Sequence, residues 1–127
     1  MTANNTDLQN RLAKSKNWHK FDNNLKFIRA LAYYTNENET LPTFTDMAEI
    51  TGLTKLQTSA AEDTNYDLGL INTKWFKKYV DGKGIWSHGY VMCMEAQAVV
   101  RDIIPLNKLE KIYDNLKKSD LLGGDYP

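Results

Sequence analysis

The sequence predicts a mainly α-helical fold that carries one small β-hairpin, and three observations support this prediction. Apolar residues recur at helical spacing within Asp22–Tyr34 and in later stretches. A turn signal, Asp81-Gly82-Lys83-Gly84, separates two runs of β-compatible residues. The length of 127 residues and the hydrophobic content of 42% suit one domain with a single core.

Residues 1–21 are predicted to form a helical N-terminal arm. Thr6 can accept hydrogen bonds from the first amides of a helix over Asp7–Ser15. Leu8 and Leu12 stand four residues apart and therefore share one face of this helix. The arm should thus carry a short apolar stripe.

The next stretch, Leu41–Ile71, is predicted to hold two helices joined by a glycine turn. Thr43 can cap the first helix, and Asp46 follows three residues later, where a carboxylate suits the positive helix end. Gly52 stops this helix because glycine adopts the left-handed conformation at little cost. The second helix is expected over residues 54–68.

Two β-compatible runs follow, and the turn signal predicts that they form a hairpin. Leu70–Val80 is rich in aromatic and branched residues, and Ile85–Met94 is the expected return strand. The period of two along a strand places five large side chains of the return strand on one face. These are Trp86, His88, Tyr90, Met92 and Met94.

The C-terminal part of the chain is predicted to be helical. Glu95–Ile104 has apolar residues along one side, and Pro105 ends this helix. Leu106–Leu122 is predicted to be a further helix with a three-four-three apolar seam. The seam consists of Leu106, Leu109, Tyr113 and Leu116.

Short motifs in these segments resemble the winged helix-turn-helix proteins, a broad class of bacterial and phage regulators. The matching residues are Met47–Lys55, with the sequence MAEITGLTK, and Leu68–Ile71, with the sequence LGLI. With the hairpin and the preceding helix, the resemblance covers Asp22–Ile104. It implies a winged helix-turn-helix with extra N- and C-terminal helices. The expected division is a helical arm, a winged helix-turn-helix domain, and a C-terminal helix and tail: residues 1–21, 22–104 and 105–127.

The resemblance leaves the packing of the second helix open. The inward positions that this class usually fills with branched aliphatic residues are polar here: Thr58, Glu62 and Asn65. A rotated helix would instead bury one leucine and two alanines: Leu56, Ala60 and Ala61. Either arrangement gives a weakly amphipathic helix.

The resemblance implies a transcriptional regulator that binds double-stranded DNA. In this class the second helix of the motif enters the major groove, so helix 54–68 would read the DNA. The side chains expected to contact bases or phosphates lie at its start: Thr54, Lys55, Gln57, Thr58 and Ser59. The wing, residues 74–88, would grip the DNA backbone through Lys74, Lys77, Lys78, Lys83 and His88. Trp75, Tyr79 and Trp86 stand between these residues.

The charge distribution supports an alternative function. Formal net charge is +0 at pH 7, but residues 1–29 carry +4, residues 30–73 carry −6 and residues 74–127 carry +2. The helix-turn-helix is therefore the acidic part of the chain, and phosphate contacts dominate DNA affinity. The alternative is a protein-interaction module on the same fold, which binds or inhibits a basic nucleic-acid-processing partner. Its acidic surface would comprise Glu49, Glu62, Asp63 and Asp67.

We also expect a homodimer. Terminal helices outside the winged core commonly form the dimer in this class, and a symmetric dimer would present two reading helices to adjacent half-sites. The expected interface consists of the apolar residues of the two terminal helices: Leu8, Leu12, Leu106, Leu109, Tyr113 and Leu116.

Catalytic and cofactor signals are weak in this sequence. His19 and His88 have no metal-ligand spacing with Cys93, and Gly82-Lys83-Gly84 is too short for a phosphate-binding loop. We therefore expect no enzyme activity, no cofactor and no metal. One cysteine favours the reducing cytoplasm, and no apolar run is long enough for a membrane helix.

Overall fold

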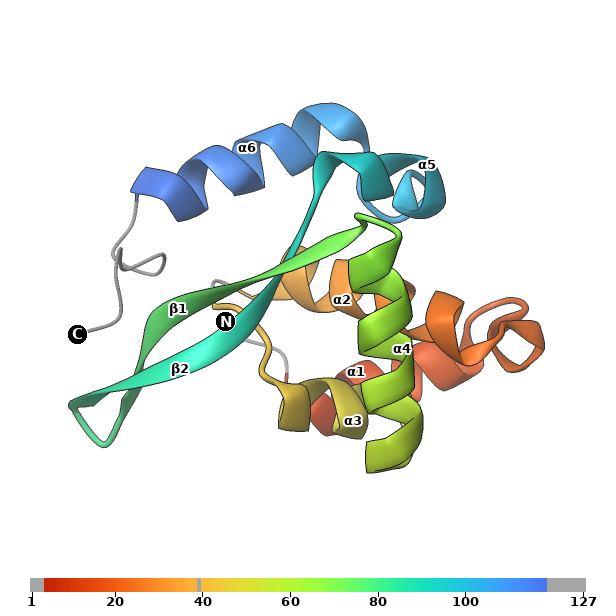
Figure 1. Cartoon of the computed structure of the whole chain (residues 1–127), viewed down its shortest axis with the longest axis horizontal. Helices are drawn as coiled ribbons and strands as arrows, with labels where there is room; N and C mark the ends of the chain where they lie inside the picture. The colour runs from red at the N-terminus through yellow and green to blue at the C-terminus, as the bar shows by residue number, and fades with distance from the viewer. Residues whose placement is uncertain (1–3, 39, 119–127) are drawn as a thin grey trace.

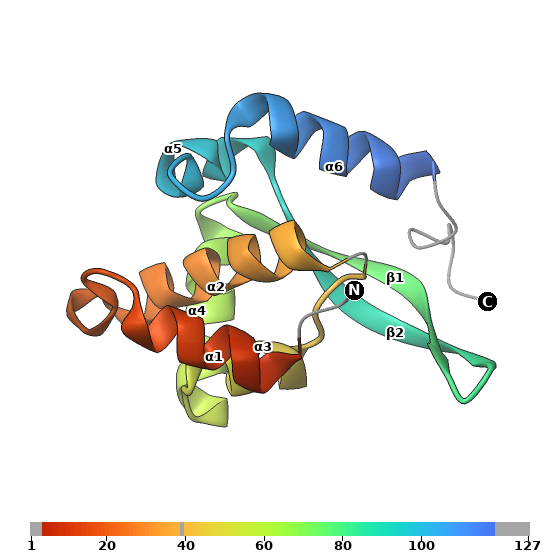
Figure 2. The same ribbon diagram turned by 180° about the vertical axis from the view of Figure 1, so that it is seen from behind.

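The computed structural model describes residues 4–38 and 40–118, and within them the fold is mainly helical with one two-stranded antiparallel hairpin. The helices are α1 Asn5–Lys14, α2 Asn23–Glu37, α3 Phe44–Thr51, α4 Lys55–Asp67, α5 Gln97–Val100 and α6 Leu106–Lys118, with short 3-10 helices at Trp18–Lys20 and Met94–Ala96. The strands are β1 Ile71–Val80 and β2 Lys83–Met92. The hairpin projects beyond the helices, with α6 along one side of it and α1 and α3 on the other (Figures 1 and 2).

Helix α1 belongs to the core of the chain. It begins two residues earlier than predicted because Asn4 caps it, accepting a hydrogen bond of 2.8 Å from the backbone N–H of Asp7. Leu8 and Leu12 are 0% and 1% exposed, and they pack in the same apolar cluster as residues of α2 and α3. The prediction that these two leucines face a second copy of the chain is therefore wrong.

The predicted boundaries of α3 are confirmed. The side chains of Thr43 and Asp46 form a reciprocal capping box with each other's backbone N–H groups. Gly52 ends the helix in the left-handed conformation with a φ of 73°. These signals depend on residues within one turn of each other, which is why the sequence reveals them.

Helix α4 buries polar side chains rather than aliphatic ones. Thr58, Ala61 and Asn65 are 0%, 1% and 1% exposed, whereas Leu56 is 85% exposed. The Thr58 hydroxyl donates a hydrogen bond of 2.7 Å to the carbonyl of Thr54. The Asn65 amide donates to the carbonyls of Asn24 and Ala61 at 3.1 and 2.8 Å. The structure therefore has the unrotated helix, and Asn65 ties α4 to the start of α2.

The hairpin turn is tighter than predicted. Asp81 and Gly82 have φ values of 53° and 79°, which is the geometry of a two-residue turn that matches the strand twist. Lys83 therefore pairs with Val80, and β2 starts two residues before the predicted return strand.

The base of the hairpin is buried on both faces. Tyr90 and Met92 join the main core, while Phe76 and Val91 pack on Leu41 in a second small cluster. A Cβ atom built on Gly89 would lie 2.6 Å from Leu41 Cβ and 2.8 Å from Phe76 Cε1. A glycine is therefore required where the chain before α3 crosses β2.

The predicted helix over Glu95–Ile104 is interrupted. The structure has only the 3-10 helix and α5 there, and the helix ends at Val100. The Arg29 guanidinium donates to the Val99 carbonyl at 3.2 Å, and the N–H groups of Ile103 and Ile104 both donate to Val100. The Val99 carbonyl, which would accept from the N–H of Ile103 in a continuing α-helix, accepts from the Arg29 side chain of α2 instead.

Candidate functional site

Four of the five residues expected to contact DNA at the start of α4 are exposed, and Thr58 is the exception. Thr54, Lys55, Gln57 and Ser59 are exposed, whereas Thr58 is 0% exposed and packs inward. The prediction that Thr58 contacts bases is therefore wrong, because its side chain has no surface to offer.

Thr54 and Gln57 also have a structural task. The Thr54 hydroxyl accepts a hydrogen bond of 3.1 Å from the backbone N–H of Gln57. The side-chain Oε1 of Gln57 in turn accepts one of 3.0 Å from the backbone N–H of Thr54. This capping box engages the acceptor atom of Gln57. The Gln57 amide nitrogen is the part of this side chain left to donate to a ligand.

Acidic residues occupy the outward side of α4 beyond its first turns. Asp63 and Asp67 are exposed opposite the buried face, together with Leu56 at 85% and Tyr66 at 51% exposure. Glu62 is half-buried beside the Tyr90 phenol; burial and this carboxylate together raise the pKa of Tyr90. The outward side of α4 is therefore acidic and apolar.

The strand register separates the five expected wing contacts into two sets. Trp75 pairs with His88, and Lys77 pairs with Trp86, so these four side chains lie on one face with Tyr79. We call this set, Trp75, Lys77, Tyr79, Trp86 and His88, the aromatic face. The other three lysines, Lys74, Lys78 and Lys83, lie on the opposite face.

Close ring contacts order the aromatic face. The Trp75 and His88 rings stack with centroids 4.8 Å apart and planes at 28°. Lys77 Nζ lies 5.5 Å from the centroid of the Trp86 ring, which is within the range of a cation–π contact. Trp75 and Tyr79 remain 37% and 67% exposed. The face therefore combines ordered rings with a lysine and a large accessible area.

The opposite face of the hairpin is less well suited to phosphate. Lys78 Nζ lies 4.0 Å from a carboxylate oxygen of Asp46, so part of its charge is already compensated. Val80 and Ile85 on this face are 46% and 50% exposed. Lys74 and Lys83 are exposed there as well.

The residues of the aromatic face are all recognisable in the sequence as wing residues, but the sequence pattern alone did not assign them to one face. Period-two alternation, combined with the two-residue turn after Val80, would have placed Trp75, Tyr79 and Trp86 beside Lys77 and His88. The lysines of the hairpin do not form one set, because the register places Lys77 on the face opposite to Lys74, Lys78 and Lys83. The informative signal is the register, and the register depends on the turn type.

Two of the four expected dimer contacts of α6 are wholly or partly covered by the chain itself. Leu109 is 1% exposed in the main core, so its predicted role in a dimer is wrong. Tyr113 is half-buried against the cluster of Leu41, Phe76 and Val91, and Leu106 is 43% exposed. The Leu116 side chain lies outside the described residues.

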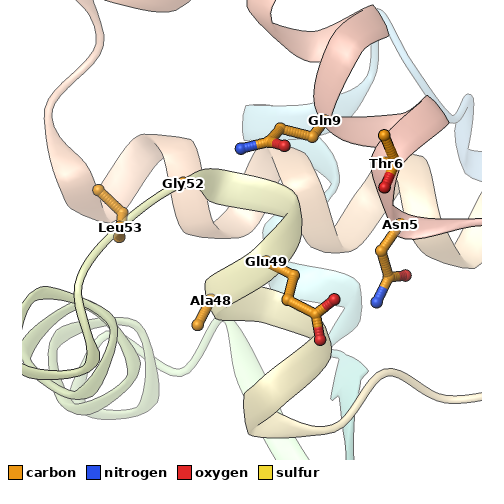
Figure 3. Close-up of a pocket in the computed structure, with 7 residues that line it drawn as sticks. All are labelled: Asn5, Thr6, Gln9, Ala48, Glu49, Gly52 and Leu53. Carbon is orange, nitrogen blue, oxygen red and sulfur yellow. The ribbon is translucent and has the colours of Figure 1, made fainter.

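A polar hollow of about 340 Å³ lies between α1 and α3 (Figure 3). Glu49 and Asn5 point into the space between the two helices, and Gln9 reaches toward Gly52. The Asn5 amide donates to Asp46 at 2.9 Å, so it serves the contact between α1 and α3. Among its lining residues only Glu49 is charged, and the hollow offers hydrogen bonds rather than reactive groups.

Other sites for chemistry are sparse in the described ranges. Across residues 4–38 and 40–118, no three His, Cys, Asp or Glu side chains gather as metal ligands. Burial raises the pKa of the Cys93 thiol, which lies directly after β2 and is half-buried. In the same part of the chain, no helix has the length and apolar character needed to cross a membrane.

No protein-family model matches this chain, and comparison with curated proteins and with solved structures finds no match.

Proposed function

We propose that this protein is a winged-helix transcriptional regulator that binds nucleic acid mainly through the outer half of its hairpin. The order of the elements supports the winged-helix part of the proposal: two helices joined by the Gly52 turn are followed by the projecting hairpin. The extended chain before α3 also joins the hairpin, because the backbone N–H of Tyr90 donates to the Pro42 carbonyl at 3.0 Å.

The observation that carries the proposal is the chemistry of the hairpin. Residues 71–92 contain four lysines and one aspartate, a net charge of +3. Lys77 lies among exposed aromatic rings, and phosphate attraction with ring contacts is the pattern of nucleic-acid binding. Lys55 and Ser59 at the start of α4 provide further exposed donors.

A salt-titrated binding measurement with random duplex DNA tests this proposal. Replacing both Lys77 and Lys78 by alanine should weaken binding to all sequences and flatten the slope of log K against log salt by about 0.9 for each lost phosphate contact. The matched control replaces Lys108 and Lys111 of α6, which are exposed lysines outside the hairpin. An unchanged slope in the hairpin variant, or no salt-dependent binding by the wild type, would contradict the proposal.

A protein-interaction module is the second candidate, and the outward side of α4 favours it. Asp63 and Asp67 repel phosphate, while Leu56, Tyr66 and Leu68 expose 85%, 51% and 63% of their area. Such a side suits a basic and partly apolar protein partner. In that case charge reversal on α4 would abolish partner binding, and hairpin lysines would have no effect on it.

A homodimer remains part of the proposal, with fewer of the expected residues in its interface. Because Leu8, Leu12 and Leu109 are buried in the core, a dimer would have to use exposed residues such as Leu106. Sedimentation of the wild type against Leu106→Glu tests this directly. A wild type that stays monomeric at high micromolar concentration would leave a single domain on each binding site.

A further inference from the structure

The outer half of the hairpin carries aromatic rings in successive rows on one face. The register places Trp75 with His88 in one row, Lys77 with Trp86 in the next, and Tyr79 with Gly84 in the third. Rows on one face of a strand are about 7 Å apart, since two residues separate them. The Tyr79 ring lies over the glycine of its row, 3.3 Å from a Cβ position built on Gly84. The aromatic face is therefore a ladder of rings with one lysine in its middle row.

We propose that the aromatic face binds unpaired nucleotides by stacking their bases on its rings, so that single-stranded DNA or RNA, or an unpaired stretch in a duplex, is the preferred ligand. This inference rests on the proposed nucleic-acid-binding function and names the ligand class of the same site. In a duplex the faces of the bases are covered by their neighbours, and the grooves offer base edges and phosphates. Exposed rings gain most from bases whose faces are open.

The ring geometry suits this ligand. Trp75 and His88 already form a nearly parallel stack, and a base placed on the exposed part of Trp75 would extend it. Tyr79, at 67% exposure, offers a further ring toward the tip. Lys77 stands between these rows and can reach a phosphate of the strand segment that runs between the two stacked bases.

The acidic side of α4 supports the same ligand independently. Docking α4 into the major groove would bring Asp63 and Asp67 toward the phosphates, because both lie on its outward side. A single strand can lie along the hairpin without approaching this side. The charge pattern thus penalises a duplex held by α4 and leaves a strand held by the hairpin unaffected.

Binding of three defined probes tests the inference in the full-length protein. The probes are an oligothymidine of about 20 nucleotides, a random duplex of the same length, and that duplex with a short unpaired stretch. We expect the wild type to bind the oligothymidine and the unpaired duplex at least about tenfold more tightly than the intact duplex. Binding should also quench the fluorescence of Trp75, whose side chain is exposed.

Two double variants separate stacking from charge. Trp75→Ala with Tyr79→Ala should lose about tenfold or more in affinity for the oligothymidine and leave duplex affinity almost unchanged. The matched control, Val80→Ala with Ile85→Ala, removes similarly exposed side chains from the opposite face and should change neither affinity. Trp75→Phe should retain most of the oligothymidine affinity, because a ring remains.

The possible failures are distinguishable. If the wild type prefers the intact duplex and the ring variant matches the control, stacking is wrong while nucleic-acid binding stands. If no probe binds, both this inference and the proposed function are wrong. If sedimentation shows a dimer that the ring variant loses, a second copy of the chain occupies the aromatic face and the inference is overturned.

Discussion

Helix α4 and the hairpin follow one another in the chain, yet they are held differently and expose opposite charge. One face of α4 is buried along its length, including the polar contact of Asn65, and residues 44–68 carry five acids and one lysine. The hairpin is buried at its base, and its residues 71–92 carry four lysines and one aspartate. The comparison teaches that the positive charge needed to attract a polyanion lies on the hairpin rather than on α4, the second helix of the motif.

The largest expected effect concerns the base of the hairpin. Gly89→Val should destabilise the protein by about 3 kcal/mol, because the new carbons overlap Leu41 and Phe76. Chemical denaturation followed by circular dichroism measures this. Gly84→Ala near the tip is the control. Its Cβ would lie 3.3 Å from Cε1 of Tyr79, but that exposed ring can move aside, so stability should change by less than about 0.5 kcal/mol. Equal midpoints for both variants would show that the base is not tightly packed.

The corresponding test for α4 is Asn65→Ala. Loss of the two hydrogen bonds to Asn24 and Ala61 leaves their carbonyls without this donor, so we expect a cost of about 2 kcal/mol in the free energy of unfolding. The same denaturation measurement applies. Asn10→Ala, at an exposed position of α1, should be neutral or slightly stabilising, since alanine is the better helix former. A neutral Asn65→Ala would contradict the role given to this contact.

The sequence predicts local features of this fold better than long-range ones. The capping box of Thr43 and Asp46 lies within four residues, so the pattern reveals it. The contact of Asn65 with Asn24 spans 41 positions, and no local pattern indicates it. Similarly, periodicity identifies the apolar face of α1 without showing that the chain's own core covers it.

In the candidate site, too, local features were predictable from the sequence and long-range features were not. Alternation along the strands predicts that Trp86 and His88 share a face, and the structure confirms this. The partners of that face on β1 depend on a two-residue turn, where the sequence suggested four residues. Whether Thr58 is buried or exposed depends on the rotation of α4 about its own axis, and the packing of α4 on α2 determines this rotation.

Charge reversal on α4 makes the comparison sharper. Replacing Asp63 and Asp67 by lysine should raise the affinity for random duplex DNA about tenfold and steepen its salt dependence. The control reverses Glu110 and Asp114 on α6, which are exposed and change the net charge equally. Equal gains in both variants would mean that total charge matters and that the position of α4 does not.

A smaller difference is expected between lysines on the two faces of the hairpin, in how much each contributes to the salt dependence of nucleic-acid binding. Lys77→Ala should reduce the salt slope by about 0.9, whereas Lys78→Ala should reduce it less, because Asp46 already lies 4.0 Å from Lys78 Nζ. Anisotropy titrations at several salt concentrations measure both slopes. A larger effect for Lys78 would move the binding surface to the opposite face.

The smallest effect lies away from both regions, at the pair of Arg29 and Asp102. Hydrogen bonding to the Arg29 guanidinium holds the pKa of Asp102 below its usual range. The pair therefore contributes stability above the unfolded pKa of about 4 and loses it as the pH falls through the lowered folded pKa. Because Asp102 is 61% exposed, Asp102→Asn should cost under about 1 kcal/mol at pH 7.

Denaturation of the wild type and Asp102→Asn across a pH series measures this contribution. The difference between the two proteins should shrink toward zero in acid. Asp114→Asn on α6 is the control, and it should show no such convergence. A difference that grows as the pH falls would contradict the assigned sign.

Gly89 divides the hairpin into two parts in which a substitution has different consequences for the core. Residues from Gly89 to Met92 are buried, so a substitution there is judged by whether it fits the core. Residues 83–88 are exposed or half-buried, so a substitution there changes the surface and leaves the core intact. The outer side chains can therefore be replaced while the packed base that holds the hairpin to the helices stays unchanged.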